Sequence, residues 1–387
     1  MPRCIQVPHT LAVQKPFIEY REKVVINNKT VRQNVTQTVM CKAKIPVYVQ
    51  THYSYPEDPA VSHDSGFVKG DANSSGGSYG LAVHAAPAPL AAASAHGRSR
   101  DIFDELKRKN SHERDARIIF RAEGHAYFID GSANKFGSVT TWLELHFPSF
   151  DADAAIDNMQ RNPIRWEKSP YYGMSREDIK AIWATNAEKA TKAGTAMHEA
   201  IELYYNAIEC GGKNEKEQEL GCTVDDLAFS SQELQNEFSF FKNFVEVVRQ
   251  HGKMRPYRTE WAVFDEDAKI AGCIDMVFEN LDGTLSIYDW KRCKNIDTKN
   301  SFRKFMTTPA LNHVPDTNFG HYCLQLNVYK YILEKNYGKT VTRLCIVNLH
   351  SDNENFQLFE AIDLQGEVKK CLQAAQGAWT SPASGSS

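Results

Sequence analysis

The chain has 387 residues, of which 42% are hydrophobic and 24% are charged, and its formal net charge is −3. This composition is ordinary for a globular protein with one large domain or two smaller ones. The near-neutral charge excludes a globally basic protein, so contact with nucleic acid requires a local basic surface. The sequence has no run of about 18 apolar residues, which predicts that the protein does not span a membrane.

Nine cysteines are scattered along the chain without a C-x-x-C pair. This pattern argues against a disulfide framework and against a zinc ribbon, and it favours a reducing compartment. The N-terminal residues lack the apolar core of a signal peptide and match a mitochondrial transit peptide only weakly. We therefore expect a soluble intracellular protein without zinc, located in the nucleus or cytoplasm rather than in mitochondria.

Residues 1–60 contain β-branched runs interrupted by prolines, which suits edge strands or extended chain. Their composition is similar to that of alveolin-type cytoskeletal repeats, so this N-terminal extension either contacts protein partners or is poorly ordered. Residues 61–113 are expected to form a disordered linker, because most of the segment is rich in Gly, Ser, Ala and Pro and has almost no large apolar side chains. A short amphipathic helix over 101–109 closes the linker.

A single domain is expected over residues 114–378, followed by a disordered tail over 379–387. It begins with a hairpin and a helix that Thr140 or Thr141 caps. After a helix over 151–159 comes a loop rich in basic and aromatic residues. Such a mixture suits a single nucleic-acid strand, or else it is an ordinary loop whose rings are anchored in the core. Its members are Arg161, Arg165, Trp166, Lys168, Tyr171 and Tyr172.

A long helical stretch, as two helices or as one interrupted near Gly194, follows Ser175 and ends near Tyr205. His198, Ile201 and Glu202 share one face of it, so Glu202 can orient the imidazole of His198 through a hydrogen bond, whereas Glu199 is expected to be solvated. A polar loop leads to an amphipathic helix over 230–251, whose apolar stripe is expected to be core.

Residues 257–293 predict three strands joined by two tight turns. Asp275 lies inside the apolar second strand, and Asp289 and Lys291 end the third strand with both side chains on one face. A buried carboxylate is costly unless it is paired, hydrogen-bonded or bound to a metal. If the second and third strands pair across their turn, Asp275 lies close to Asp289.

Two carboxylates at one sheet edge favour a hard divalent cation that takes oxygen ligands, Mg²⁺ or Mn²⁺. The Lys291 ammonium beside them can orient or help deprotonate a bound water, or neutralise charge that develops on a phosphate. The basic run that follows either binds phosphate or forms a solvated face. It comprises Arg292, Lys294, Lys299, Arg303 and Lys304. A helix over 320–335, with Gln325 and Tyr329 on one face, a strand over 341–349 and a helix over 368–378 complete the domain.

Gly272-x-x-Asp275 followed by Asp289-x-Lys291 resembles the core of the PD-(D/E)XK nuclease superfamily, RecB-like branch. The segment GTAMH, which ends at His198, resembles the upstream helix motif of that branch, and Gln325 with Tyr329 resembles its downstream motif. Residues 138–156 are similar to PD-(D/E)XK proteins of large DNA viruses and some protists. The resemblance covers residues 115–375 or so, and the alternative is a solvated hairpin with incidental charges.

This resemblance implies an α/β fold with a restriction-endonuclease-like core, in which helices cover both faces of a central mixed sheet. It also implies that His198 joins Asp275, Asp289 and the carbonyl of Trp290 in holding one or two Mg²⁺ ions. Glu260, at a position where the branch often has an acid, is either a further ligand or an anchor for a basic residue. Gln325 and Tyr329 are expected to touch the substrate backbone, with Arg292 and Lys294 nearby. Some RecB-like nucleases hold an iron–sulfur cluster in C-terminal cysteines, but only Cys371 lies beyond Cys345, so none is expected.

The function that the resemblance implies is metal-dependent hydrolysis of DNA, with exonuclease action on free or single-stranded ends in replication, repair or recombination. A structure-specific endonuclease is the nearest alternative. The alternative from another class is a non-catalytic DNA-binding or scaffold protein that uses residues 1–60 as a cytoskeletal-type segment.

Overall fold

The computed structural model describes residues 104–121, 126–131, 136–209, 231–300 and 304–378, together with five short strands before residue 50. The remainder of the expected extension, the greater part of the expected linker and the expected tail lie outside the described residues. The five short strands are β1 (Arg3–Gln6), β2 (Lys23–Ile26), β3 (Lys29–Arg32), β4 (Gln37–Met40) and β5 (Pro46–Val49).

A mixed sheet forms the centre of the protein, in the order β1-β4-β5-β13-β12-β11-β10-β8, with β9 also paired to β10. The β9–β10 and β10–β11 pairs are antiparallel and the β11–β12 pair is parallel, so β11 links the two kinds of pairing. The strands of this centre are β8 (Gly137–Ser138), β9 (Met254–Asp265), β10 (Ile270–Asn280), β11 (Leu285–Lys291), β12 (Val341–Asn348) and β13 (Gln357–Glu360).

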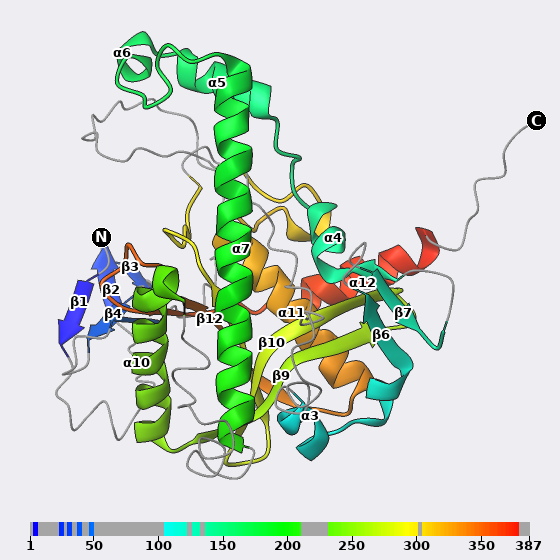
Figure 1. Ribbon diagram of the computed structural model, residues 1–387. Helices are drawn as coiled ribbons and strands as arrows, with labels where there is room; N and C mark the ends of the chain where they lie inside the picture. Colours follow the sequence, from blue (N-terminus) through cyan, green and yellow to red (C-terminus); the bar gives the residue numbers. More distant parts are fainter. Residues whose placement is uncertain are drawn as a thin grey trace, which may run out of the picture.

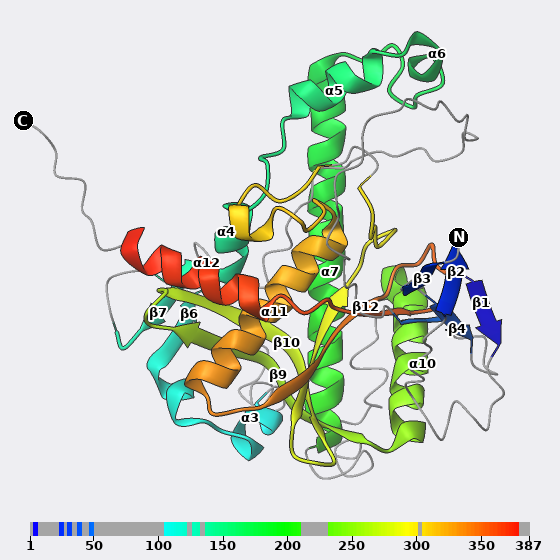
Figure 2. The same ribbon diagram turned by 180° about the vertical axis from the view of Figure 1, so that it is seen from behind.

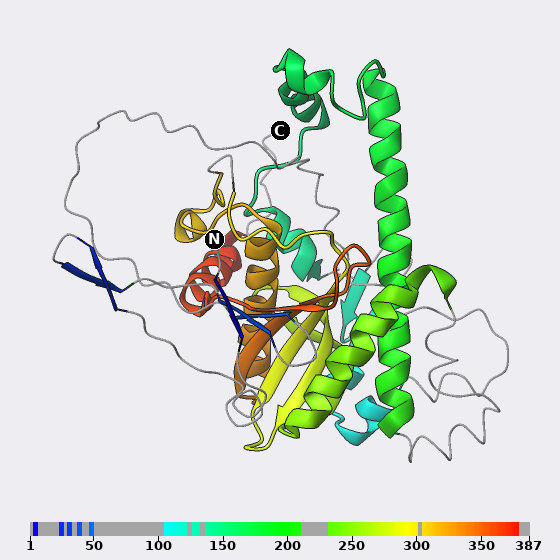
Figure 3. The ribbon, with the colours of Figure 1, turned by 90° about the vertical axis from the view of Figure 1, so that its left-hand side faces the viewer.

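Helices cover both faces of this sheet, as Figures 1 and 3 show. The helices α4 (Val139–Glu144), α11 (Asn318–Asn336) and α12 (Gln365–Ala378) pack on one face. The helices α7 (Arg176–Glu209) and α10 (Gln235–His251) pack on the other. The expected α/β fold, with a central mixed sheet between helices, is therefore confirmed.

The sequence explains where several helices begin and end. The α10 stripe of Phe238, Phe241 and Phe244 is buried against the sheet, and Gly252 ends the helix in the left-handed conformation, with a φ of 57°. The N-cap of α4 is Ser138, whose hydroxyl accepts a hydrogen bond from the Thr141 N–H, so a cap at Thr140 or Thr141 was wrong. The stretch before Glu209 is one continuous helix of 34 residues.

Residues 104–113 pack on the domain rather than belonging to a linker, which corrects the expected boundary at residue 114. In α3 (Glu105–Lys109), the Leu106 side chain is fully buried and its N–H donates to Asn206 Oδ1 of α7 at 2.9 Å. The Asn110 side chain donates to the Tyr257 carbonyl of β9 at 2.7 Å. Leu106 is the one apolar residue in a charged pentapeptide, so the sequence predicted a helix but not its burial.

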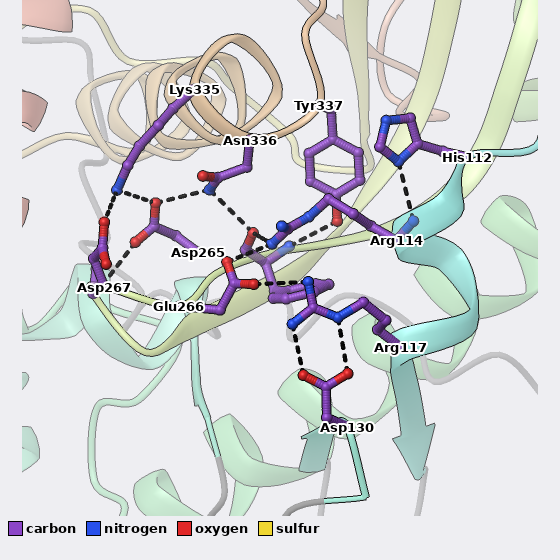
Figure 4. A network of polar contacts seen from close by, with 12 residues as sticks. His112, Arg114, Arg117, Asp130, Asp265, Glu266, Asp267, Lys335, Asn336 and Tyr337 are labelled. Carbon is purple, nitrogen blue, oxygen red and sulfur yellow. Dashed lines mark hydrogen bonds and ion pairs between the residues drawn. The ribbon is translucent and has the colours of Figure 1, made fainter.

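The segment that follows α3 fixes β9 and the β9–β10 turn. It comprises the short helix η1 (Glu113–Arg117) and the hairpin of β6 (Ile118–Arg121) and β7 (Ala126–Ile129). Arg114 donates to Glu266 Oε2 at 2.6 Å, while the buried Asp265 accepts from Lys335 Nζ at 2.6 Å and from Asn336 Nδ2 at 2.8 Å (Figure 4). Residues from η1 and α11 thus hold both sides of this turn.

Asp115 of η1 anchors β9 through a buried ion pair. Its carboxylate accepts from Arg258 at 2.7 Å and from the Trp261 indole at 3.0 Å, and the Arg258 side chain is 3% exposed. Burial alone would raise the pKa of Asp115, but the hydrogen bond and charge of Arg258 outweigh it and lower the pKa below its ordinary value of 3.8.

Replacing Asp115 with Asn leaves the Arg258 guanidinium buried without a counter-charge. We expect Asp115→Asn to lower the free energy of unfolding by about 3 kcal/mol near neutral pH. The pKa of Asp115 is lower in the folded state than in the unfolded state. The extra stability of the wild type over the variant is therefore fully present above the unfolded-state pKa and is lost as the pH falls through the folded-state pKa. Urea unfolding at several pH values measures this.

The exposed Glu354, which has no charged partner among the described residues, provides the matched control Glu354→Gln. It should unfold like the wild type at every pH. A loss in Asp115→Asn that stays constant across the acidic range would contradict the assigned pKa.

Candidate metal centre

Glu260 and Asp275 lie opposite each other on β9 and β10. The pairs that flank them in the antiparallel ladder are Trp261↔Ile274 and Thr259↔Met276. Opposite residues of such a ladder project from the same face of the sheet, so both carboxylates meet there. Glu260 has a φ of 40°, a left-handed conformation that a residue with a side chain adopts only when its surroundings enforce it.

Asp275 stands where β10 and β11 separate. The ladder between the two strands ends at Met276↔Tyr288, and beyond it the Asp275 carboxylate accepts the Trp290 N–H at 2.9 Å. Asp275 is 5% exposed. The side chain therefore takes the place of a main-chain acceptor and is fixed in the opening between two strands.

His198 of α7 completes a group of three possible metal ligands with Glu260 and Asp275, whose ligand atoms all lie within 4.8 Å of one another. Its Nδ1 lies 3.6 Å from Glu260 Oε1 and 3.7 Å from Asp275 Oδ2. Its Nε2 lies 3.0 Å from the Trp290 carbonyl. Since a carbonyl only accepts, Nε2 carries the proton, and Nδ1 faces the two carboxylates.

The electrostatics of this group favour a cation. Burial opposes a charge on His198, but the carboxylates of Asp275 and Glu260 outweigh it and raise the pKa of His198 to about 9. Burial also raises the pKa of Asp275. Nδ1 of His198 is buried and has no hydrogen-bond partner in the described part of the chain. One imidazole nitrogen and two carboxylates are donors suited to a divalent cation, which would replace the proton on Nδ1.

Asp289 and Lys291 lie beside this group as a buried ion pair. Lys291 Nζ is 2.6 Å from Asp289 Oδ2, and the two side chains are 6% and 2% exposed. Burial raises the pKa of Asp289 to about 7 although the charge of Lys291 opposes this. Oδ1 of Asp289 is buried without a hydrogen-bond partner among the described residues. Asp289, expected as a ligand, is thus paired with Lys291 through one oxygen, which leaves the other available.

The helix α11 supplies the remaining polar side chains of the site. Gln325 Oε1 accepts from Lys291 Nζ at 3.4 Å, and Gln325 Nε2 donates to the Tyr329 hydroxyl at 3.4 Å. The Lys291 ammonium also lies 4.7 Å from the centre of the Tyr322 ring. Of the two residues expected from the sequence, Gln325 contacts Lys291 directly and Tyr329 contacts Gln325.

Two glutamates on α7 lie near Glu260. Burial, followed by the charge of Glu260, raises the pKa of Glu202 well above its ordinary value, and the same two causes raise that of Glu199. Glu199 Oε1 is buried and has no hydrogen-bond partner among the described residues, so the expectation that Glu199 is solvated was wrong. The spacing of residues on α7 did not predict this burial of Glu199, because it does not show that Glu199 and Glu202 both lie near Glu260 of β9.

The basic residues that follow β11 make ion pairs of their own. Arg292 Nε donates to Glu237 Oε1 of α10 at 2.9 Å, and the Glu237 side chain is fully buried. Lys294 lies 3.1 Å from Asp352 and is exposed. The structure does not place either of them in contact with the three possible ligands.

The mixed sheet, the three clustered possible metal ligands and the adjoining lysine point to the nuclease class. A family profile of the PD-(D/E)XK nuclease superfamily matches residues 154–380, which is more than half of the chain, and the protein belongs to this superfamily. The expected nuclease fold and superfamily are thereby confirmed. A comparison with curated proteins found no match. Within the part of the chain that the structure describes, every helix is too short or too polar to cross a bilayer.

Gly272, the first residue of the motif that contains Asp275, is needed for the approach of α11. A Cβ at this position would lie 2.8 Å from Tyr329 Cε1 and 3.0 Å from Val139 Cγ2. We expect Gly272→Ala to lower the free energy of unfolding by about 1–3 kcal/mol. Nuclease activity should fall at least tenfold, because Tyr329 and its partner Gln325 shift relative to Lys291.

Gly366 on α12 provides the matched control, since a Cβ there meets nothing within 4 Å. Gly366→Ala should retain wild-type activity and stability. Thermal unfolding and nuclease rates measure both variants, and wild-type behaviour of Gly272→Ala would show that the close contact does not position the site.

Proposed function

We propose that this protein is a Mg²⁺-dependent deoxyribonuclease, similar to the RecB-like branch, that digests DNA from free or single-stranded ends. The observation that carries the proposal is the cluster of His198, Glu260 and Asp275 beside the buried Asp289–Lys291 pair. Three ligands and an adjacent ammonium are the groups needed to bind a phosphodiester and to direct water at it. The preference for ends rests on the motifs that resemble this branch.

The roles of the side chains follow from their contacts. A divalent cation held by His198, Glu260 and Asp275 would polarise the scissile phosphate and lower the pKa of a bound water. Asp289 keeps the Lys291 ammonium charged and in place. Lys291 orients the attacking water or neutralises charge on the phosphate, and Gln325 sets the direction of its Nζ.

The donor set also bears on the choice of metal. Carboxylates suit Mg²⁺ and Mn²⁺ alike, whereas an imidazole is a softer ligand than Mg²⁺ prefers. We propose that Mg²⁺ is the physiological ion and that Mn²⁺ supports activity at lower concentration. The wider proposal places the enzyme inside the cell, in DNA replication, repair or recombination, with residues 1–60 available to protein partners.

Lys291→Ala and Asp289→Asn test the mechanism directly. Both should lower the rate of digestion of end-labelled linear DNA at least a hundredfold. Lys291→Ala removes the ammonium that faces the reacting phosphate, and Asp289→Asn removes the carboxylate that holds this ammonium in place. The assay compares Mg²⁺, Mn²⁺ and EDTA, and EDTA should abolish digestion. The exposed Lys369 of α12 gives the control Lys369→Ala, which should keep wild-type rates.

Three outcomes would contradict parts of this proposal. Digestion at wild-type rate by both site variants would remove Lys291 and Asp289 from the mechanism. Cleavage of circular DNA at the rate of linear DNA would assign an endonuclease. Tight DNA binding without digestion under any metal would assign a non-catalytic DNA-binding protein.

A further inference from the structure

A helical arm projects from the domain at the end of α7 that is remote from Glu209. We define the arm as residues 150–183, which include α5 (Ala152–Gln160), α6 (Pro163–Trp166) and the first turns of α7. In Figures 1 and 2 the arm rises clear of the sheet and of the helices that cover it. None of its described side chains belongs to the two hydrophobic clusters that cover the faces of the sheet.

We define the tip of the arm as residues 161–172, which include α6 and most of the loop before α7. Its aromatic side chains are Trp166, Tyr171 and Tyr172, and none of them belongs to the hydrophobic clusters that cover the sheet. Tyr172 is 56% exposed. The rings of Trp166 and Tyr172 lie 6.1 Å apart in a T-shaped pair, and Tyr171 makes a similar pair with Trp183 at 6.0 Å. Their mutual contacts hold the rings in place, so a ligand that stacks on Tyr172 need not order it first.

The exposed charges at the tip are mostly positive. Arg161, Arg165 and Lys168 are exposed, and none of them has an ion-pair partner in the described part of the chain. Glu167 is the one acid among them. Arg176 and Lys180, in the first turns of α7, are instead paired with acids of α5, namely Asp153 and Asp157. The exposed acids Glu177 and Asp178 lie between them in the sequence. Residues 161–172 thus carry three basic side chains and one acidic side chain, in a chain with a net charge of −3.

We propose that the tip of the arm binds single-stranded nucleic acid and guides it to the metal centre, an inference that rests on the proposed nuclease function. Cations without acidic partners bind phosphates, and exposed rings stack on unpaired bases. A duplex hides the faces of its bases, so the rings favour a single strand. An apolar protein partner would leave the three cations unmatched.

The geometry of α7 connects the tip with the site. Arg176 and His198 belong to the same continuous helix, and at 1.5 Å per residue they are about 33 Å apart. The segment after β11, residues 292–300, lies on the same side of the sheet as the arm in Figures 1 and 3. The exposed Lys189 stands on α7 between the two. A strand held at the tip is thereby directed along α7 toward His198.

The test uses the full-length chain and binding rather than cleavage as its first readout. Arg165→Glu/Lys168→Glu and Tyr172→Ala are compared with Lys369→Glu/Lys370→Glu, an equal change of charge at exposed positions of α12. Fluorescence anisotropy with a single strand of about 30 nucleotides, in EDTA and at several salt concentrations, gives affinity and salt slope.

We expect the Arg165/Lys168 variant to bind at least tenfold more weakly than the α12 control. Its slope of log affinity against log salt should be shallower by about 1.4, because two phosphates of the single strand are no longer neutralised by the protein. Tyr172→Ala should weaken binding about tenfold by removing a stacking surface, with little change of slope. Duplex binding should change less in each case.

Cleavage supplies the second readout. On the long strand the arm variants should raise KM and leave kcat unchanged. A single strand of about four nucleotides, even when extended, is shorter than the distance of about 33 Å between Arg176 and His198, so the arm variants should cut it like the wild type.

Failure of the inference and failure of the proposed function give different results. Arm variants that bind and cut the long strand like the α12 control would overturn the inference, whether or not the protein is a nuclease. If the arm variants bind the strand more weakly but the wild type cuts no substrate, the role of the arm in binding is supported and the proposed nuclease function is rejected. Self-association of the wild type that the arm variants abolish, with unchanged strand binding, would assign the tip to contact between copies.

Discussion

The site depends on two carboxylates, those of Glu260 and Asp275, that are held together on adjacent strands where water is largely excluded. The two carboxylates repel each other, so the pair requires a nearby positive charge, a bound cation or a proton on one of the carboxylates. The strained φ of Glu260 shows that the fold enforces the arrangement. The two residues before Glu260 are fixed by hydrogen bonds: Arg258 donates to Asp115, and the Thr259 hydroxyl accepts from Asn206 at 2.8 Å. Segments far apart in the chain thus hold the strained residue.

The centre also joins the two faces of the sheet. His198 arrives from α7 on one face, while Gln325 and Tyr329 arrive from α11 on the other. They meet where β10 and β11 separate, since only there can side chains from both sides reach Asp275 and Lys291. Gly272 permits the approach of α11, and the polar contacts of the β9–β10 turn fix the strand that carries Glu260. Stability and function are therefore coupled in this part of the molecule.

The sequence predicted the parts of the site that follow from simple periodicity. The three strands, the shared face of Asp289 and Lys291, and the helix positions of Gln325 and Tyr329 needed only the periods of strands and helices. The role of Glu260 stayed open because a left-handed residue departs from the strand period. Glu237 lies on the buried face of α10 among apolar residues, so the sequence did not predict its ion pair with Arg292. The burial of Leu106 and the position of Glu199 depend on packing between distant segments, which periodicity does not contain.

Anomalous diffraction from crystals of the full-length chain soaked in Mn²⁺ measures the central claim most directly. The account predicts one strong peak at about 2.0–2.3 Å from Nδ1 of His198 and from oxygens of Glu260 and Asp275. The same crystals of Asp275→Asn should lose that peak and keep the fold. A peak elsewhere, or side chains of His198, Glu260 and Asp275 that point apart with no ion between them, would contradict the account.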